Sequence, residues 1–453
     1  MEKEILELIE KRDFSRLRRF LSDINPADIA YYFNEISTKD LPWVFRILPK
    51  ETASEVFVLM ESDMQQLLIE AFSDKELKEV MDELFLDDAV DIIDEMPASV
   101  AKRIIKQADA DTRKQINQLL AYPDDSAGSI MTTEYVDLKK DMTVEEAFKR
   151  IRSKGLDSET IYTCYVIDGS RRLEGIVTVK DLLLSHANST LDEIMETSII
   201  FAYTHDDRED VAEKFSRYDF FALPVVDREN RLVGIVTVDD AIDVIMEEAT
   251  EDIEKMAAIS PSEKSYFKTG IFTTFKARIP WLLLLMISAT FTGAIISSFE
   301  SKLTAVPALI AFIPMLMDTA GNCGSQSSVT IIRSISLGDI EFKDIFRVIW
   351  KELRVAFLCS IVLVSVNFLK LMVVDYWILG NFSTEKQITQ IWVVCLTQFF
   401  TVIIAKAVGC ILPIIAKKIG FDPAVMASPF ITTIVDAIAL AIYFTTAVLL
   451  LRI

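Results

Sequence analysis

The feature that most constrains the fold is a series of five long apolar segments after residue 270. They cover approximately residues 280–299, 306–332, 355–374, 389–416 and 423–451. A helix of about 20 predominantly apolar residues is long enough to cross the hydrocarbon core of a bilayer. We therefore expect residues 271–453 to form an all-α transmembrane domain of five helices. Because five is odd, the two ends of this domain would lie on opposite sides of the membrane.

Charge divides the chain at the same place. Residues 1–270 hold 33 Lys and Arg against 58 Asp and Glu, whereas the remainder holds 14 against 10. An acidic soluble part thus precedes an apolar part, which excludes a single globular enzyme and a nucleic-acid binder that uses a basic patch. The five cysteines have no CxxC or CxxH spacing. A zinc site, a disulfide framework and a thiolate enzyme are therefore not expected, and we assign no catalytic residues.

The distribution of basic residues predicts the orientation. One side of the predicted membrane domain has Lys268, Lys276, Arg278, Arg333, Lys343, Arg347, Lys351, Arg354, Lys417 and Lys418, and the other has only Lys302, Lys386 and Arg452. The side richer in Lys and Arg normally faces the cytoplasm. The N-terminal residues also lack the pattern of a signal peptide. We expect a multi-pass membrane protein with cytoplasmic N-terminal domains and the C-terminus outside.

Polar residues interrupt the second apolar segment, where each would be costly in lipid. The segment contains Pro314, Asp318, Gly321, Asn322, Gly324 and Gln326. Such a composition favours a broken or kinked helix that lines a polar cavity. We expect Gly321 and Gly324 to bend or unwind it, with Asn322 and Gln326 turned inward.

The fifth apolar segment has one carboxylate, Asp436, close to Thr432 and Thr433. Neighbouring helices or protonation could satisfy this carboxyl group; alternatively, it is a cation ligand in a pore. The oxygen groups nearby suit Mg²⁺, Ca²⁺ or Mn²⁺ better than Zn²⁺ or Cu⁺. Lys370 and Lys406 also lie in apolar segments, where each would either snorkel or pair with a carboxylate.

The soluble part contains an internal repeat over residues 130–184 and 194–247. Gly175-Ile-Val-Thr-Val-Lys-Asp181 in the first copy corresponds to Gly234-Ile-Val-Thr-Val-Asp-Asp240 in the second. In each copy an amphipathic helix precedes apolar strands, which predicts an α/β unit. The repeat resembles a tandem pair of CBS domains, which are usually regulatory sensors of nucleotides or ions.

Residues 1–128 are helical by pattern and acidic. Asp88, Asp91 and Glu95 are spaced to share one helix face. An uninterrupted acidic stretch from Val238 to Ile259 predicts one connecting helix of about 20 residues. Acidic faces on separate domains would repel each other unless cations bridged them, which is the physical basis of a divalent-cation sensor. The alternative is an ordinary solvated acidic surface.

The order of these parts resembles the MgtE family of bacterial Mg²⁺ transporters and channels. The resemblance covers essentially the whole chain. Two membrane motifs carry it, Asp318-Thr-Ala-Gly-Asn-Cys-Gly-Ser-Gln326 and Ser428-Pro-Phe-Ile-Thr-Thr-Ile-Val-Asp436. It implies a superhelical N domain (1–128), CBS domains (129–190 and 191–246), a connecting or plug helix (240–270) and the transmembrane domain (271–453).

The resemblance also implies site residues. A homodimer would place the pore on its two-fold axis, with Asp436, Thr432, Asn322 and Asp318 as pore residues. The cytosolic Mg²⁺ sensor would comprise Asp88, Asp91, Glu95, Asp219, Asp240, Asp243, Glu248, Glu251 and Asp252. Phe220 and Asp181 are candidate ATP contacts, because some CBS pairs of the family resemble ATP binders.

The resemblance thus implies a Mg²⁺-selective transporter or channel of the bacterial inner (cell) membrane that conducts Mg²⁺ into the cytoplasm and is inhibited by intracellular Mg²⁺. Two alternatives belong to other classes. One is a proton- or Na⁺-coupled divalent-cation carrier that uses Lys370 or Lys406 in coupling. The other is a sensor that is merely anchored by its spans, against which the polar motifs argue.

Overall fold

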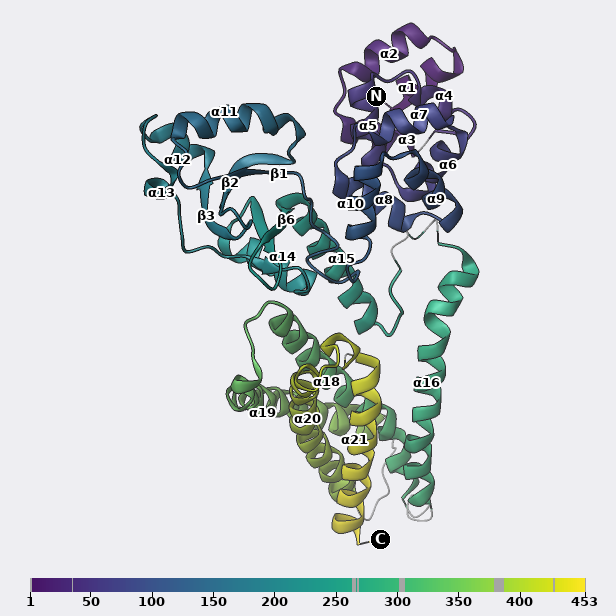
Figure 1. Ribbon diagram of the computed structural model, residues 1–453. Helices are drawn as coiled ribbons and strands as arrows, with labels where there is room; N and C mark the ends of the chain where they lie inside the picture. The colour runs from purple at the N-terminus through teal and green to yellow at the C-terminus, as the bar shows by residue number, and fades with distance from the viewer. Residues whose placement is uncertain are drawn as a thin grey trace. The chain divides into compact units, whose positions relative to one another are not determined.

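The computed structural model describes residues 2–452 except 35, 263–265, 267–268, 301–305, 379–386 and 427. The chain folds into two compact units, residues 1–245 and 246–453. Each unit is described by itself below, with the element labels of Figure 1.

The first unit begins with short helices: α1 (Glu2–Glu10), α2 (Phe14–Ser22), α3 (Pro26–Phe33), α4 (Leu41–Phe45), α5 (Lys50–Val58), α6 (Ser62–Ala71), α7 (Asp74–Met81), α8 (Leu86–Glu95), α9 (Ala98–Gln107) and α10 (Ala110–Leu119). Local signals set their starts. Ser73 and Glu76 form a capping box at α7, and Asp109 accepts hydrogen bonds at the start of α10. Pro49 and Pro97 occupy the N-cap positions of α5 and α9.

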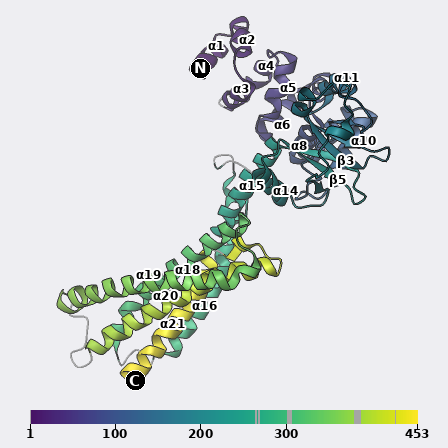
Figure 2. The ribbon, with the colours of Figure 1, turned by 90° about the vertical axis from the view of Figure 1, so that its left-hand side faces the viewer.

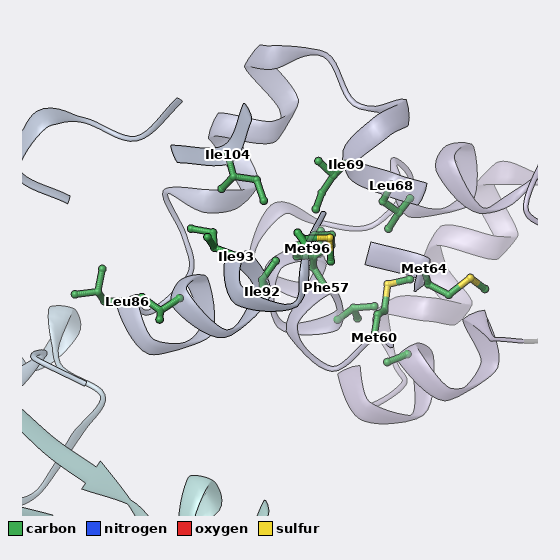
Figure 3. Packing of buried hydrophobic residues seen from close by; sticks show 14 of the residues in the cluster. Phe57, Met60, Met64, Leu68, Ile69, Leu86, Ile92, Ile93, Met96 and Ile104 are labelled. Carbon is green, nitrogen blue, oxygen red and sulfur yellow. The ribbon is translucent and has the colours of Figure 1, made fainter. Parts of the chain in front are cut away.

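Apolar side chains on successive helices close a shared core. Figure 3 shows Phe57 of α5, Leu68 of α6 and Ile92 and Ile93 of α8 gathered with Met96. All five are buried. Isolated helices as short as α1–α10 are only marginally stable in water. Packing of their apolar faces on neighbouring helices therefore supplies most of their stability.

Two three-stranded sheets follow. The first copy of the repeat comprises β1 (Tyr135–Leu138), α11 (Val144–Lys154), η1 (Gly155–Asp157), β2 (Thr160–Ile167), β3 (Leu173–Thr178), α12 (Val179–Leu184) and α13 (Leu191–Ile194). The second comprises β4 (Ala202–Tyr203), α14 (Arg208–Tyr218), β5 (Ala222–Val226), β6 (Leu232–Thr237) and the start of α15 (Val238–Met256). In both, the first strand is parallel to the second and the second is antiparallel to the third. The predicted repeat is confirmed.

The two copies exchange their leading segments. Met131 precedes the first copy yet packs over Gly234 of the second, and Met195 precedes the second yet packs over Gly175 of the first. A Cβ at Gly234 would lie 2.8 Å from the Met131 Sδ atom, and one at Gly175 would lie 2.5 Å from that of Met195. Each glycine therefore admits the other copy's methionine. This exchange gives a physical reason for the repeated Ile-Met and Gly-Ile-Val-Thr-Val signatures.

The connecting helix is shorter than the sequence pattern predicts. The helix α15 ends at Met256, not at Ile259 or near residue 270. Ala258 adopts a positive φ of 55°, and the Ile259 N–H donates to the Glu254 carbonyl at 2.9 Å, as in a helix-terminating turn. Pro261 follows, where it cannot continue a helix. Part of the remaining predicted range, residues 263–265 and 267–268, lies outside the described residues.

The second unit is helical: α16 (Ile271–Ser298), η2 (Pro307–Phe312), α18 (Ile313–Ser336), η3 (Phe342–Asp344), α19 (Ile345–Lys370), η4, a π-helical stretch (Leu371–Ile378), α20 (Gln387–Lys418), η5 (Pro423–Met426) and α21 (Ser428–Leu451). Among the described residues, four helical stretches are long and apolar enough to cross a membrane: Ile271–Ser298, Phe342–Ile378, Ile388–Lys418 and Pro423–Leu451. The remaining predicted span, the second apolar segment, corresponds to α18 (Ile313–Ser336), whose polar residues lower its hydropathy.

The helix α18 packs against both α20 and α21, and these helices run side by side in Figures 1 and 2. Gly324 of α18 meets Gly409 of α20 so closely that a Cβ on Gly409 would collide with the Gly324 carbonyl oxygen. Small residues allow such close approach of helix backbones in membranes. The contact between these two glycines fixes how α18 sits on α20.

We predict that Gly409→Ala destabilises the membrane unit by about 2 kcal/mol or more, because the added methyl group forces the two backbones apart. Thermal unfolding of the purified protein in detergent measures the effect. Gly293→Ala is the matched control, since a Cβ at this position of α16 meets no heavy atom within 4 Å. Equal melting temperatures for the two variants would contradict the predicted packing role.

Candidate functional site

The predicted pore aspartate lies where α18 and α21 touch. Gly321 of α18 faces Thr432 and Asp436 of α21: a Cβ at Gly321 would lie 3.0 Å from the Thr432 Cγ2 atom and 3.9 Å from the Asp436 Oδ1 atom. Asp318 of α18 is close enough to interact electrostatically with Asp436. The structure thus brings together Asp318, Thr432 and Asp436.

The second span is neither broken nor unwound, because α18 is one continuous helix from Ile313 to Ser336, while a bend at Gly321 and Gly324 stays a prediction. Gly321 and Gly324 act instead as close-contact positions, the first against α21 and the second against α20. The helix α18 continues through both glycines. Their missing side chains leave room for α21 and α20 to approach. A glycine pair in an apolar segment is compatible with close helix contact and with an interrupted or bent helix, so the sequence alone did not separate the two.

Asp318, Asn322 and Gln326 are spaced four residues apart and lie exposed along one face of α18 within the single chain. Asn322 therefore shares a helix with Gly321 without being buried against α21. The Thr432 and Thr433 hydroxyls both donate to the Pro429 carbonyl, at 2.9 and 3.1 Å. Thr432 still has oxygen lone pairs with which to accept a hydrogen bond beside Asp436.

The two lysines of the apolar segments have local partners. Lys370 forms an ion pair with Asp375 at 3.1 Å, which confirms the expectation of a carboxylate partner. Lys406 instead donates to the Ser327 Oγ atom at 3.3 Å. Neither side chain needs to snorkel to an interface to find a polar partner.

A second candidate site lies in the first unit, where carboxylates from α8 and the CBS pair converge. Asp87 and Asp88 begin α8, Glu134 and Glu159 precede β1 and β2, and Asp240 lies in the first turn of α15. The Leu86 N–H donates to the Glu134 Oε2 atom at 2.8 Å, which ties the start of α8 to the CBS pair. We call Asp87, Asp88, Asp91, Glu134, Glu159, Asp239 and Asp240 the acidic cluster.

The acidic cluster holds its protons more tightly than free carboxylates do. Burial, with repulsion from Asp88, raises the pKa of Asp87 to about 7, and this side chain is only 8% exposed. Burial and repulsion from Asp240 raise the pKa of Asp88 to about 6. Burial and repulsion from Asp87 act likewise on Asp240, with a pKa of about 7, and on Glu159, with a pKa of about 9.

Asp91 stands at the exposed edge of the acidic cluster, where desolvation and repulsion from Asp240 raise its pKa to about 8. The Glu159 Oε2 atom is buried without a hydrogen-bond partner among the described residues. No three His, Cys, Asp or Glu side chains in the described part of the chain already form a metal-binding group. The cluster is thus a concentration of repelling oxygen groups, which suits a hard cation, rather than a finished coordination shell.

The structure divides the predicted sensor residues between the two units. Asp240 joins Asp88 and Asp91 in the acidic cluster, and the exposed Asp243 lies one helical turn further along α15. Glu95 is exposed at the end of α8. Asp219 ends α14 in a left-handed conformation with φ 55°. Glu248, Glu251 and Asp252 belong to the part of α15 in the second unit.

In that second unit, the end of α15 is attached to the membrane helices. The Ser336 hydroxyl of α18 donates to the Asp252 Oδ2 atom at 3.0 Å. Lys255 forms an ion pair with Asp422 at 2.6 Å and another with Glu251. Although desolvation opposes the charge of Lys255, these two carboxylates raise its pKa overall. Glu251 and Asp422 are therefore neutralised by a cation that belongs to the protein itself.

The two candidate nucleotide contacts lie on different elements of the CBS pair. Phe220 is stacked on Tyr218 with ring centroids 5.5 Å apart and packs against the core. The exposed rings are those of Tyr162 and Phe221, 6.1 Å apart. Asp181 accepts hydrogen bonds from Thr178 in the capping box of α12. It lies at the start of a helix, where its carboxylate remains exposed.

Several residues of these sites were missed in the sequence. Asp87 directly precedes Asp88, so the acidic run pointed to it. Glu134 and Glu159 come from distant segments that only the fold brings to α8. For the exposed Tyr162 and Phe221, alternation along the strand could have indicated Tyr162 alone.

Comparison with known families gives matches along most of the chain. A family model described as the divalent cation transporter MgtE matches residues 313–446. The MgtE intracellular N domain matches residues 24–125, and the CBS domain matches residues 127–187 and 191–247. These ranges follow the helical, CBS and membrane parts described above.

Curated relatives match over nearly the full length. The magnesium transporter MgtE of Thermus thermophilus is 36% identical over 450 residues, which cover 98% of this chain and 97% of the relative. The magnesium transporter MgtE of Bacillus subtilis is 33% identical over 440 residues, with coverage of 96% and 93%.

Solved structures resemble about half of the chain. A crystal structure of the cytosolic domain of the Mg²⁺ channel MgtE in complex with ATP is 36% identical with a TM-score of 0.52, and covers 54% of this chain and 100% of that chain. The soluble part of a magnesium transporter is 28% identical with a TM-score of 0.51, and covers 55% and 98%. These relatives are transporters, not enzymes. The chain belongs to the MgtE family of membrane-embedded magnesium transporters.

Proposed function

We propose that this protein is a Mg²⁺-selective transporter or channel that carries Mg²⁺ into the cytoplasm. The observation that carries the proposal is the carboxylate of Asp436, placed beside Thr432 and near Asp318 where Gly321 lets α18 approach α21. Two carboxylates per chain are too few to strip Mg²⁺ of all its water. Such a site suits recognition of a hydrated ion through hydrogen bonds to the coordinated waters.

A homodimer would complete this site. The exposed row of Asp318, Asn322 and Gln326 lies at membrane depth, where polar side chains require protein or water rather than lipid. A second copy would cover this face of α18 and enclose a polar path. It would also supply a second Asp436, so that two carboxylates attract one divalent cation.

The excess of Lys and Arg on one side of the membrane domain supports an inner-membrane protein with cytoplasmic N-terminal domains and an external C-terminus. In this orientation the acidic cluster samples cytoplasmic Mg²⁺. A proton- or Na⁺-coupled carrier remains the alternative, but Lys370 and Lys406 each have a local partner that accounts for a structural role. Uptake that needs neither a pH gradient nor Na⁺ would separate the two.

The acidic cluster is proposed as the sensor of a feedback gate. Cytoplasmic Mg²⁺ would neutralise its repulsion and hold α8 against the start of α15. The helix α15 is uninterrupted over 19 residues, about 28 Å, and its far end contacts α18 through Asp252. Cation binding at one end can therefore shift the closed and open populations at the other. In this proposal Asp252 and Lys255 hold α15 as a plug.

ATP is a proposed second ligand of the CBS pair. The related cytosolic domain that was crystallised with ATP supports this, because it matches the first unit at 36% identity. The exposed rings of Tyr162 and Phe221 offer a stacking surface for adenine. Asp181 is exposed and can accept hydrogen bonds from ribose hydroxyls, whereas Phe220 would support Phe221 from the core side.

We predict that Asp436→Asn reduces Mg²⁺ uptake into proteoliposomes by at least about tenfold, because a neutral amide attracts a divalent cation much less than a carboxylate does. Asn keeps the size of the side chain, so the protein should remain assembled on gel filtration. Asp339→Asn, in the loop after α18, is the matched control and should transport normally. Uptake by the Asp436 variant at the parental rate would rule out its pore role.

We also predict that docking of α8 on the CBS pair depends on pH in metal-free protein. The pKa values of the acidic cluster are raised in the docked state, so docking is favoured at low pH and lost as pH rises through about 6 to 9. A rise from 3.8 to about 7, as for Asp87, corresponds to roughly 4 kcal/mol. The shifts share the same repulsions and do not add.

Hydrogen exchange of the Leu86 amide, corrected for its intrinsic pH dependence, reports this docking because Glu134 accepts its hydrogen bond. Protection should be high at pH 5.5, low at pH 8.5 and restored at pH 8.5 by millimolar Mg²⁺. Asp87→Asn combined with Asp240→Asn should weaken the dependence, because Asp88 and Glu159 still titrate, while Asp111→Asn on α10 should leave it unchanged. Protection that is the same at both pH values in metal-free parent protein would refute the repulsion argument.

A further inference from the structure

A buried lysine outside the pore contact requires an explanation. Lys406 is only 5% exposed and lies within α20, one of the helices apolar enough to cross a membrane. A charged side chain at this depth is costly unless a partner compensates it. Its Nζ atom donates to the Ser327 Oγ atom of α18 at 3.3 Å, and the Ser327 hydroxyl donates to the Glu352 Oε2 atom of α19 at 2.7 Å.

One hydroxyl thus joins a cation and an anion from three different helices. Ser327 is itself buried, with 2% exposure, and does not belong to the exposed polar row of α18. The arrangement satisfies Lys406 and Glu352 together, whereas removal of either would leave the other without its compensating charge. The two charges are therefore expected to depend on each other.

The location of this arrangement connects it to Asp436. Lys406 precedes Gly409 by one helical turn, and Gly409 makes the closest backbone contact of α20 with Gly324 of α18. Gly321, one turn before Gly324, faces Asp436. The helix α18 therefore contacts Glu352 of α19 and Lys406 of α20 on one side and Asp436 of α21 on another. A shift of α18 at Ser327 would be carried by the helix to Gly321.

We infer that Lys406, Ser327 and Glu352 form a charge-balanced positioning network that fixes α18 and thereby sets its approach to Asp436. The inference rests on the proposed function for its transport readout only. None of the three contacts the ion: they act through the position of Gly321. The network couples the α19–α20 pair to the ion-recognition contact in α21, so its charges influence apparent Mg²⁺ affinity from outside the pore.

The test is a double-mutant cycle in full-length protein, with Lys406→Met, Glu352→Gln and the combined variant. Each single variant should raise the KM for Mg²⁺ uptake by roughly tenfold, within the range of coupled pairs, and lower the melting temperature in detergent. The combined variant should return to within about twofold of the parent in KM, because no uncompensated charge remains. Thr401→Val, a buried hydroxyl elsewhere on α20, is the matched control and should leave KM unchanged.

Two results would overturn the inference. Defects that simply add in the combined variant would show that the charges do not compensate each other. Single variants with lower melting temperatures and an unchanged KM would reduce the network to a structural contact. If the single variants do not assemble, Lys406→Arg and Ser327→Ala test the same bridge with both charges retained. If the parent takes up no Mg²⁺, the proposed function fails, while the melting cycle still decides whether the charges are coupled.

Discussion

Both candidate sites depend on one constraint: their carboxylates have no cationic partner among the described residues. In the acidic cluster, Asp87, Asp88 and Asp240 repel one another in a half-buried setting, and the described residues show no ion pair to any of them. Asp436 faces Asp318 in the same way. Two like charges about 4 Å apart repel by roughly 4 kcal/mol at the effective dielectric near a protein surface. A cation from solution therefore has a reason to bind in both places.

The protein's own cations are used elsewhere. Lys255 neutralises Glu251 and Asp422 at the end of α15, and Lys406 is joined to Glu352 through Ser327. Both contacts attach helices to one another rather than attract a mobile ion. The carboxylates of these two contacts thus hold structure, whereas those of the acidic cluster and Asp436 are the ones that we propose for Mg²⁺. The sensor residues predicted as one set fall on both sides of this division.

The sequence predicted the architecture well because its signals are local and repeated. The Gly-Ile-Val-Thr-Val signature recurs in both CBS copies, and the exchange of Met131 and Met195 between them explains why the preceding motif recurs as well. The predicted break in α18 is not found, because glycine also permits close helix contact without interrupting the helix. The end of α15 at Met256 was missed because Ala258 adopts a positive φ, which an alanine in the sequence does not predict. Glu134 and Glu159 join the acidic cluster only through tertiary contacts, which no spacing in the sequence encodes.

We propose that the acidic cluster controls the pathway at Asp436 in response to the cytoplasmic Mg²⁺ concentration. Mg²⁺ influx into proteoliposomes, measured while the Mg²⁺ on the cytoplasmic face is set from micromolar to millimolar, tests it most directly. Influx through the parent should fall across this range. Replacement of Asp87, Asp91 and Asp240 by Asn should abolish this dependence on Mg²⁺. Influx through the open pathway should still require Asp436. Influx through the Asn variant that falls at the same Mg²⁺ concentration as in the parent would contradict the account.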